Sequence, residues 1–152
     1  MEKKEETSTK EDYLILLDVN GLLGTKTKDT FKLHSGAKSF ISFCYDIARV
    51  GIFSSMYRKN IFKVLDDILT EEQKHDMYVI FDRDSCVSDP AAENPWDTIK
   101  NLNLIRGTCS KFKKIILCDD TESKVRFNDD NEVIVSTDYE YIKKELVSRL
   151  HI

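Results

Sequence analysis

The sequence predicts a single α/β domain with a mainly parallel sheet and helices on both faces. Short apolar runs of strand length alternate with segments of helical periodicity. Several of these runs stop abruptly at polar residues, as buried strands do at the edge of a sheet. The chain has 152 residues, of which 41% are apolar and 33% charged, so it can bury a real core. Strands that alternate with helices favour βαβ crossovers, and therefore parallel strands.

Five apolar runs are expected to form the strands. The first covers residues 13–17, reads Tyr-Leu-Ile-Leu-Leu and ends at Asp18. A continuous apolar run suits a strand that is buried on both faces. The other four are expected at residues 50–53, 77–81, 115–118 and 132–135. Parallel sheets bind ligands beyond the carboxyl ends of their strands, so the residues that follow these runs are the first candidates for a site.

Helical periodicity fills the segments between the runs. Apolar residues at helical spacing predict helices over residues 40–48 and 61–69. Residues 70–73, Thr-Glu-Glu-Gln, suit a capping box that opens a further turn. An Asn-Pro pair predicts the start of a helix that runs over residues 96–104. A second capping box predicts a closing helix over residues 137–150.

Composition indicates the extent of the folded domain, the cellular compartment and the kinds of partner that the chain can have. Residues 1–12, MEKKEETSTKED, are expected to form a flexible charged tail, which leaves residues 13–152 as the folded domain. The net charge of −4 gives no strong nucleic-acid signal. The four cysteines are scattered and contain no CxxC pair, which predicts reduced thiols in a cytoplasmic or nuclear protein. No apolar run reaches the roughly 20 residues that a membrane helix needs.

Polar residues gather at three of the predicted strand ends. Asp18 follows the first run, Ser54 and Ser55 follow the second, and Asp119 and Asp120 follow the fourth. Each feature alone is as easily explained by a helix cap or a turn. Together they would place several carboxylates at one edge of a sheet, which invites a hard cation such as Mg²⁺. Hydroxyls and free backbone amides beside them would hold phosphate oxygens.

Four motifs in this order resemble the haloacid-dehalogenase superfamily. Residues 17–23, LDVNGLL, are similar to its DxDx(T/V) signature. The branch it most resembles is that of the RNA polymerase II C-terminal-domain phosphatases, also called NLI-interacting-factor-like. Its other motifs resemble GIFSS at 51–55, DRDSC at 82–86 and ILCDDTESK at 116–124. The resemblance covers nearly the whole chain from residue 13. It implies the haloacid-dehalogenase fold without a large cap domain, and a phosphoprotein or phosphopeptide partner.

The resemblance also implies roles for individual residues. Asp18 would be the nucleophile that attacks phosphorus and becomes an aspartyl-phosphate. Ser54, Ser55 and Lys100 would bind the phosphate and neutralise the transferring phosphoryl group. The Mg²⁺ ligands that it implies are Asp18, Asn20 through its backbone carbonyl, Asp119 and Asp120.

The chain departs from the family pattern at positions that bear on turnover. The second aspartate of the signature is Asn20, and an amide cannot serve as the general acid and base, a role that contributes about 10²–10⁴-fold. The usual Thr is Leu22, which removes a loop hydroxyl. The segment from Asp18 to Ser54 is short and leaves little room for the small hairpin insertion common in this branch.

Two hypotheses about function follow. The first is a phosphatase-like binding module, a pseudophosphatase whose turnover is weak or lost because Asn20 replaces the acid–base aspartate. The alternative is an active Mg²⁺-dependent phosphoserine/phosphothreonine phosphatase that forms an aspartyl-phosphate. A third hypothesis, a structural subunit like the mitochondrial import member of this family, is expected less, because no presequence or membrane helix is recognised.

Overall fold

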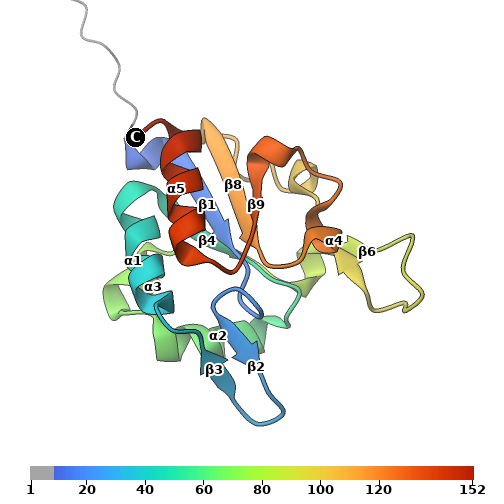
Figure 1. The fold of residues 1–152 in the computed structure, drawn as a ribbon. Helices are drawn as coiled ribbons and strands as arrows, with labels where there is room; N and C mark the ends of the chain where they lie inside the picture. The colour runs from blue at the N-terminus through green and yellow to red at the C-terminus, as the bar shows by residue number, and fades with distance from the viewer. Residues whose placement is uncertain (1–8) are drawn as a thin grey trace, which may run out of the picture.

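The computed structural model describes residues 9–152, which form a five-stranded parallel sheet with helices packed on it (Figure 1). The strands are β1 (Tyr13–Leu17), β4 (Arg49–Phe53), β5 (Ile80–Phe81), β8 (Lys114–Asp119) and β9 (Val133–Val135). Their order is β5-β4-β1-β8-β9, and every neighbouring pair is parallel. The predicted fold class is confirmed, and β1 lies in the middle of the sheet. The predicted strand over residues 77–81 is shorter than expected.

Both faces of β1 are buried, which explains why its sequence is apolar throughout. Tyr13, Ile15 and Leu17 pack into one hydrophobic cluster, whereas Leu14 and Leu16 pack into a second. The alternation follows from the two-residue period of a strand. The sheet therefore separates two cores.

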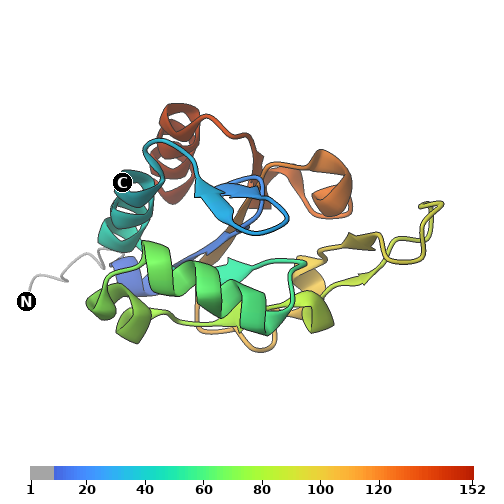
Figure 2. The same ribbon diagram turned by 90° about the horizontal axis from the view of Figure 1, so that it is seen from below.

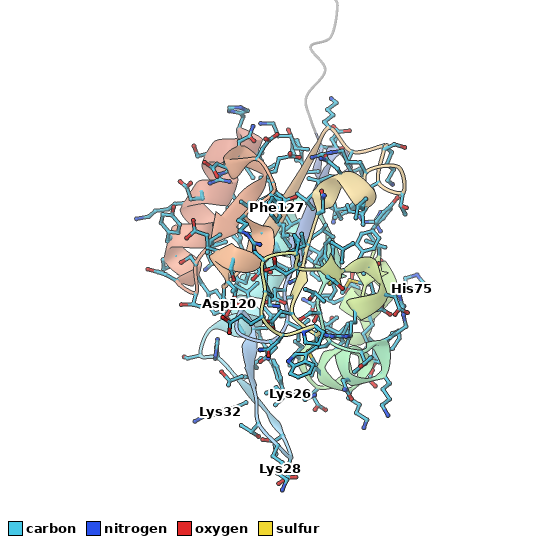
Figure 3. All side chains as sticks on the ribbon, turned by 90° about the vertical axis from the view of Figure 1, so that its right-hand side faces the viewer. Lys26, Lys28, Lys32, His75, Asp120 and Phe127 are labelled. Carbon is cyan, nitrogen blue, oxygen red and sulfur yellow. The ribbon has the colours of Figure 1, made fainter. Side chains whose placement is uncertain are left out.

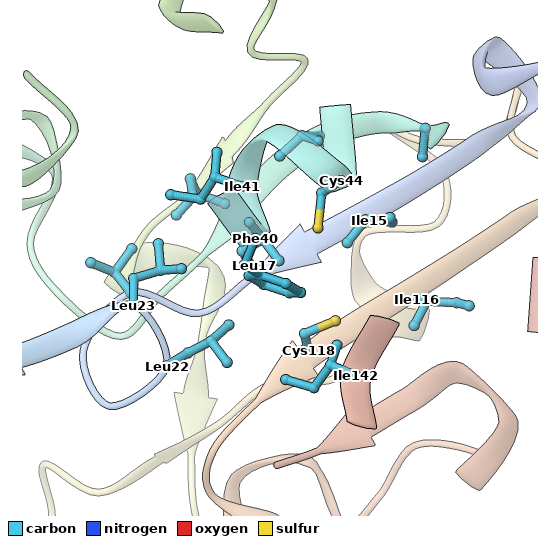
Figure 4. Packing of buried hydrophobic residues seen from close by; sticks show 14 of the residues in the cluster. Ile15, Leu17, Leu22, Leu23, Phe40, Ile41, Cys44, Ile116, Cys118 and Ile142 are labelled. Atoms are coloured by element: carbon cyan, nitrogen blue, oxygen red, sulfur yellow. The ribbon is translucent and has the colours of Figure 1, made fainter. Parts of the chain in front are cut away.

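The first core lies under α1 (Ala37–Ile47), α2 (Arg58–Ile68) and α5 (Tyr139–Leu150) (Figure 4). These three helices confirm the ones that were predicted over residues 40–48, 61–69 and 137–150. The short helix α3 (Glu71–Asp76) begins with the predicted capping box, in which Thr70 and Gln73 bond each other's backbone. The cap of α5 is Asp138, one residue later than the predicted box, and its carboxylate accepts bonds from two backbone amides.

The second core is covered mainly by irregular chain. The predicted helix over residues 96–104 is wrong: β7 (Thr98–Ile99) pairs with β6 (Val87–Ser88), and only η3 (Leu102–Leu104) is helical there. A tertiary contact explains why no helix forms here. The Lys100 amide donates to the Lys124 carbonyl at 2.7 Å, which holds this segment in an extended conformation. Short elements complete this side: η2 (Arg83–Ser85), α4 (Glu122–Val125) and η4 (Asp130–Glu132).

A small hairpin follows β1, contrary to the expectation that the segment leaves little room for one. It consists of β2 (Gly24–Lys26) and β3 (Phe31–Leu33), which pair antiparallel. Only a short turn joins the strands, so the hairpin fits within the limited length. Figure 2 shows it on the same side of the molecule as α2.

The described chain begins with η1 (Lys10–Asp12), which is held to the domain. Glu11 forms an ion pair with Arg49 at 3.1 Å, and the Asp12 carbonyl accepts from the Lys113 amide at 2.7 Å. Residues 1–8 of the predicted tail lie outside the described residues. No helix in the described part is long and apolar enough to span a bilayer.

Candidate functional site

The register of the parallel strands brings the residues of the candidate site together at one edge of the sheet. Leu17 at the end of β1 pairs with Ile52 of β4 and with Cys118 of β8. The next residue, Asp18, donates its amide to the Cys118 carbonyl at 3.0 Å. Asp119 therefore lies directly beside Asp18, and Ser54 follows the neighbouring strand on the other side. The predicted meeting of these strand ends at one edge is confirmed.

Lys100 joins the two aspartates in a buried charge cluster, the name used below for Asp18, Lys100 and Asp119. Its Nζ lies 3.0 Å from Asp18 Oδ1 and 2.5 Å from Asp119 Oδ2. The three residues are only 5%, 1% and 0% exposed. An ammonium this deeply buried needs compensating charge, and the two carboxylates supply it. With both carboxylates ionised, the cluster carries one surplus negative charge.

Burial and close charges shift the acidity of this cluster in opposite directions. Burial raises the pKa of the Asp18 carboxyl to about 8, with Asp119 adding to the rise and Lys100 opposing it. Burial alone would lower the pKa of Lys100, but the two adjacent carboxylates outweigh it and raise that pKa. A further cation beside Asp18 would favour its ionised form.

The carboxylates fit a divalent cation. Asp18, Asp119 and Asp120 each offer one oxygen, and these oxygens lie within 4.8 Å of one another. Hard oxygen ligands suit Mg²⁺. The second oxygen of Asp119 accepts from the Thr121 amide at 2.9 Å, which fixes the orientation of that carboxylate.

Ser54 and Ser55, two of the three predicted phosphate-binding residues, lie between β4 and α2. Ser54 is buried, and its Oγ accepts from the Met56 amide at 3.1 Å. Ser55 is half-buried, and its carbonyl accepts from Arg83 at 3.4 Å. The Tyr57 side chain does not cap α2; the Asn60 amide donates to the Tyr57 carbonyl, whereas the Arg58 and Lys59 amides have no partner among the described residues. Free amides at a helix N-terminus favour anions.

Asn20 lies outside the charge cluster. Its side chain is exposed, and Oδ1 accepts from the Lys26 amide at 2.9 Å, which ties the start of the hairpin to the loop after Asp18. Because a backbone amide can only donate, the oxygen of the Asn20 side chain must face it. The Asn20 side chain therefore holds the hairpin against the loop after Asp18.

Sequence reasoning missed Gly21. This residue has φ +96°, and a Cβ at its position would overlap the carboxylate of Asp120. Glycine alone fits both the backbone conformation and the close approach. A glycine that immediately follows Asn20 in the signature was the available signal.

Leu22 belongs to the core. Its side chain is fully buried in the first hydrophobic cluster, near Leu17 and Phe40 (Figure 4). Its carbonyl accepts from the Tyr139 hydroxyl at 2.6 Å. An apolar side chain therefore suits this position better than the threonine of the family pattern, whose hydroxyl would need a partner.

Comparison with known proteins agrees with the fold. A structure from Listeria monocytogenes serotype 4b, of an uncharacterized protein, is 13% identical, with a TM-score of 0.61; the match covers 91% of this chain and 99% of that one. Fcp1, an essential RNA polymerase II CTD phosphatase, is 12% identical, with a TM-score of 0.56; the match covers 93% of this chain. This chain spans about half of Fcp1, 50% of its length.

A second Fcp1 structure, of the fission yeast R271A protein bound to beryllium fluoride, is 13% identical with a TM-score of 0.52; the match covers 93% of this chain and 51% of that one. At such identities these likenesses establish the fold alone. No curated protein sequence matches. The family model described as NLI interacting factor-like phosphatase matches residues 1–151. This chain therefore belongs to the NLI interacting factor-like phosphatase family.

Proposed function

We propose that this domain binds phosphorylated serine or threonine of a partner protein at the charge cluster, with turnover that is weak or lost. The observation that carries the proposal is the buried Lys100 between Asp18 and Asp119, at 3.0 and 2.5 Å. Such a cluster costs folding free energy and adds little to stability, so a functional role explains it better than a structural one.

Each residue of the site would act on one part of a phosphoryl group. Asp18 would attack phosphorus, so the bond to the leaving oxygen breaks as the bond to the carboxylate forms. Lys100, the Ser54 hydroxyl and the first-turn amides of α2 would offset the charge on the phosphoryl oxygens. Asp18, Asp119, Asp120 and the Asn20 carbonyl would hold Mg²⁺, whose charge would assist the same stabilisation.

Asn20 supports the loss of turnover. In a full cycle a carboxylic acid protonates the leaving oxygen and the resulting carboxylate then activates water. The amide of Asn20 can do neither, and its oxygen is already bonded to the Lys26 amide. A phosphorylated Asp18 would then be hydrolysed slowly.

The alternative, an active phosphatase, is favoured by the complete set of Asp18, Ser54, Lys100 and Asp119. Aryl phosphates have good leaving groups and need little protonation, so the first step could proceed without Asn20's help. An initial burst followed by slow turnover would then appear with such a substrate.

The decisive experiment is a beryllofluoride titration with Mg²⁺, followed by ¹⁹F NMR and crystallography. We expect beryllium to bond to the Asp18 carboxylate in the native chain and to give no bound signal with Asp18→Asn. Asp46→Asn, the same change at an exposed position of α1, is the matched control and should behave as the native chain. A native chain that gives no bound signal with Mg²⁺ present would refute the proposal.

A further inference from the structure

A groove that reaches the loop after Asp18 is lined by charged side chains that the proposed phosphoryl chemistry does not use. It has a volume of about 380 Å³ and lies between the β2–β3 hairpin and α2. One wall consists of residues 26–31, and Met56 lies at its inner end. The other wall consists of Asn60, Lys63, Val64 and Asp67, whose spacing of three, four and seven residues places them on one face of α2. We call this feature the hairpin groove.

Both walls of the hairpin groove begin at the candidate site. The hairpin wall is tied to the loop after Asp18 by the bond from the Lys26 amide to Asn20 Oδ1. The helix wall begins after Ser54, whose Oγ accepts from the Met56 amide. Figure 3 shows Lys26 and Lys28 along the hairpin as it extends away from Asp120. A peptide whose phosphorylated residue reached Asp18 could therefore continue along the groove.

Lysines outnumber acids in this groove. Lys26, Lys28 and Lys63 line it, and none forms an ion pair with a described residue. Lys59 lies one helical turn before Lys63 and is exposed. The acids of the groove are Asp29 and Asp67. This local excess of positive charge contrasts with the net charge of −4 for the whole chain.

Apolar side chains share the groove with these lysines. Phe31, Met56 and Val64 contribute to its lining. They can contact the methylene groups of an extended side chain while its charged end reaches a lysine. The combination suits glutamate or aspartate in an extended peptide better than a bare anion.

We infer that the hairpin groove binds acidic residues that flank the phosphorylated serine or threonine of the partner. This inference rests on the proposed function and names its substrate class: acidic phosphopeptides. Each exposed pair contributes little, but several lysines on a preformed groove add selectivity and attract an acidic segment at low salt.

The test compares fluorescent peptides by anisotropy, at low salt and with Mg²⁺. One peptide carries phosphoserine between glutamates, the second has glutamines in their place, and the third is the glutamate peptide without phosphate. The native chain should bind the acidic phosphopeptide about tenfold more tightly than the neutral one, as a few exposed pairs can supply. Lys28→Gln with Lys63→Gln should reduce that ratio to about twofold.

Lys38→Gln with Lys144→Gln is the matched control, because it removes the same charge from exposed lysines elsewhere on the chain. It should keep the native ratio. At about 1 M salt, where the Debye length falls to roughly 3 Å, the native ratio should approach one. An equal ratio in the native chain and the groove variant would overturn the inference. So would tighter binding of a single-stranded oligonucleotide than of the acidic phosphopeptide.

Competition with inorganic phosphate separates this inference from the proposed function. If phosphate displaces both phosphopeptides but the glutamates confer no preference, the inference fails and the proposed function stands. If the third, unphosphorylated peptide binds as tightly as the acidic phosphopeptide and phosphate displaces neither, the proposed function fails.

Discussion

The charge cluster and the loop after Asp18, residues 19–23, lie next to each other but differ in how closely they match the family pattern. The cluster consists of three charged residues to which the family resemblance assigns roles, and their side chains are almost entirely buried. The loop departs from the family pattern at Asn20 and Leu22, yet both residues are integrated into the structure. Asn20 holds the hairpin through the Lys26 amide, and Leu22 fills the core. Both residues at which the loop differs from the family pattern therefore have a structural role.

This contrast shows which changes such a site can accept. Removing one charge from the cluster leaves the others buried without compensation, which is costly. Replacing a carboxylate with an amide at an exposed loop position leaves the hydrogen bond intact, because both side chains offer an oxygen. Position 20 should therefore tolerate an exchange of carboxylate for amide better than the cluster tolerates the loss of Lys100.

Lys100→Met gives the largest expected effect, since it leaves Asp18 and Asp119 buried without their cation. We expect a loss of about 3–5 kcal/mol in the free energy of unfolding, measured by urea titration. Lys144→Met, at an exposed position, should stay within about 0.5 kcal/mol of the native chain. A loss below about 1 kcal/mol for Lys100→Met would show that the cluster is not held as the distances indicate.

The fold could be predicted from the sequence wherever burial dictates the pattern. The run over residues 13–17 is apolar because both faces of β1 are covered, so its strand was recognisable. The Asn-Pro pair before residue 96 failed as a helix signal, because a local preference of about 1 kcal/mol was outweighed by tertiary contacts. Ile99 and Leu102 are buried there, and Lys100 bonds the backbone of Lys124.

The site was predictable only in part. Strand ends located Asp18, Ser54 and Asp119, because parallel register brings such ends together. Lys100 was recognisable only from the family resemblance, since irregular chain carries it to the sheet. The packing of Leu22 and the contact between Gly21 and Asp120 depend on distances that no local pattern encodes.

Leu22→Thr should be the costliest change in the loop. Threonine would remove apolar volume from a fully buried position and introduce a hydroxyl there, at about 2–4 kcal/mol. Differential scanning calorimetry would measure it. Leu104→Thr is the control, because Leu104 is 60% exposed and should cost far less. Equal losses at the two positions would mean that Leu22 is not a core residue. Threonine at position 22 is therefore not expected to raise turnover by itself.

Gly21→Ala should have a smaller effect, about 1–3 kcal/mol, because of its positive φ and the adjacent Asp120 carboxylate. Displacing Asp120 should also weaken Mg²⁺ binding, which calorimetric titration would detect. Gly107→Ala is the matched control, since nothing lies near a Cβ at that position and its φ is not positive. Unchanged Mg²⁺ affinity in Gly21→Ala would argue against Asp120 as a ligand.

Asn20→Asp has the smallest expected effect and tests the comparison most directly. The new carboxylate can still accept from the Lys26 amide through one oxygen, so the hairpin should remain in place and stability should change little. Its other oxygen could serve as the acid and base, and hydrolysis of an aryl phosphate with Mg²⁺ should rise at least about tenfold, or about 1.4 kcal/mol in the barrier.

The rate-limiting step decides where that gain appears. If water attack on phosphorylated Asp18 limits the native chain, the burst should persist and only the steady state should accelerate. Asn20→Ala is the control: it loses the bond to Lys26 and gains no acid, so its steady-state rate should not rise. Asp18→Asn combined with Asn20→Asp must be inactive, because any remaining activity would belong to a contaminant. Asn20→Asp could keep the native stability and still show no Mg²⁺-dependent turnover. In that case residues other than Asn20 also prevent turnover, and the domain is better explained as a binding module.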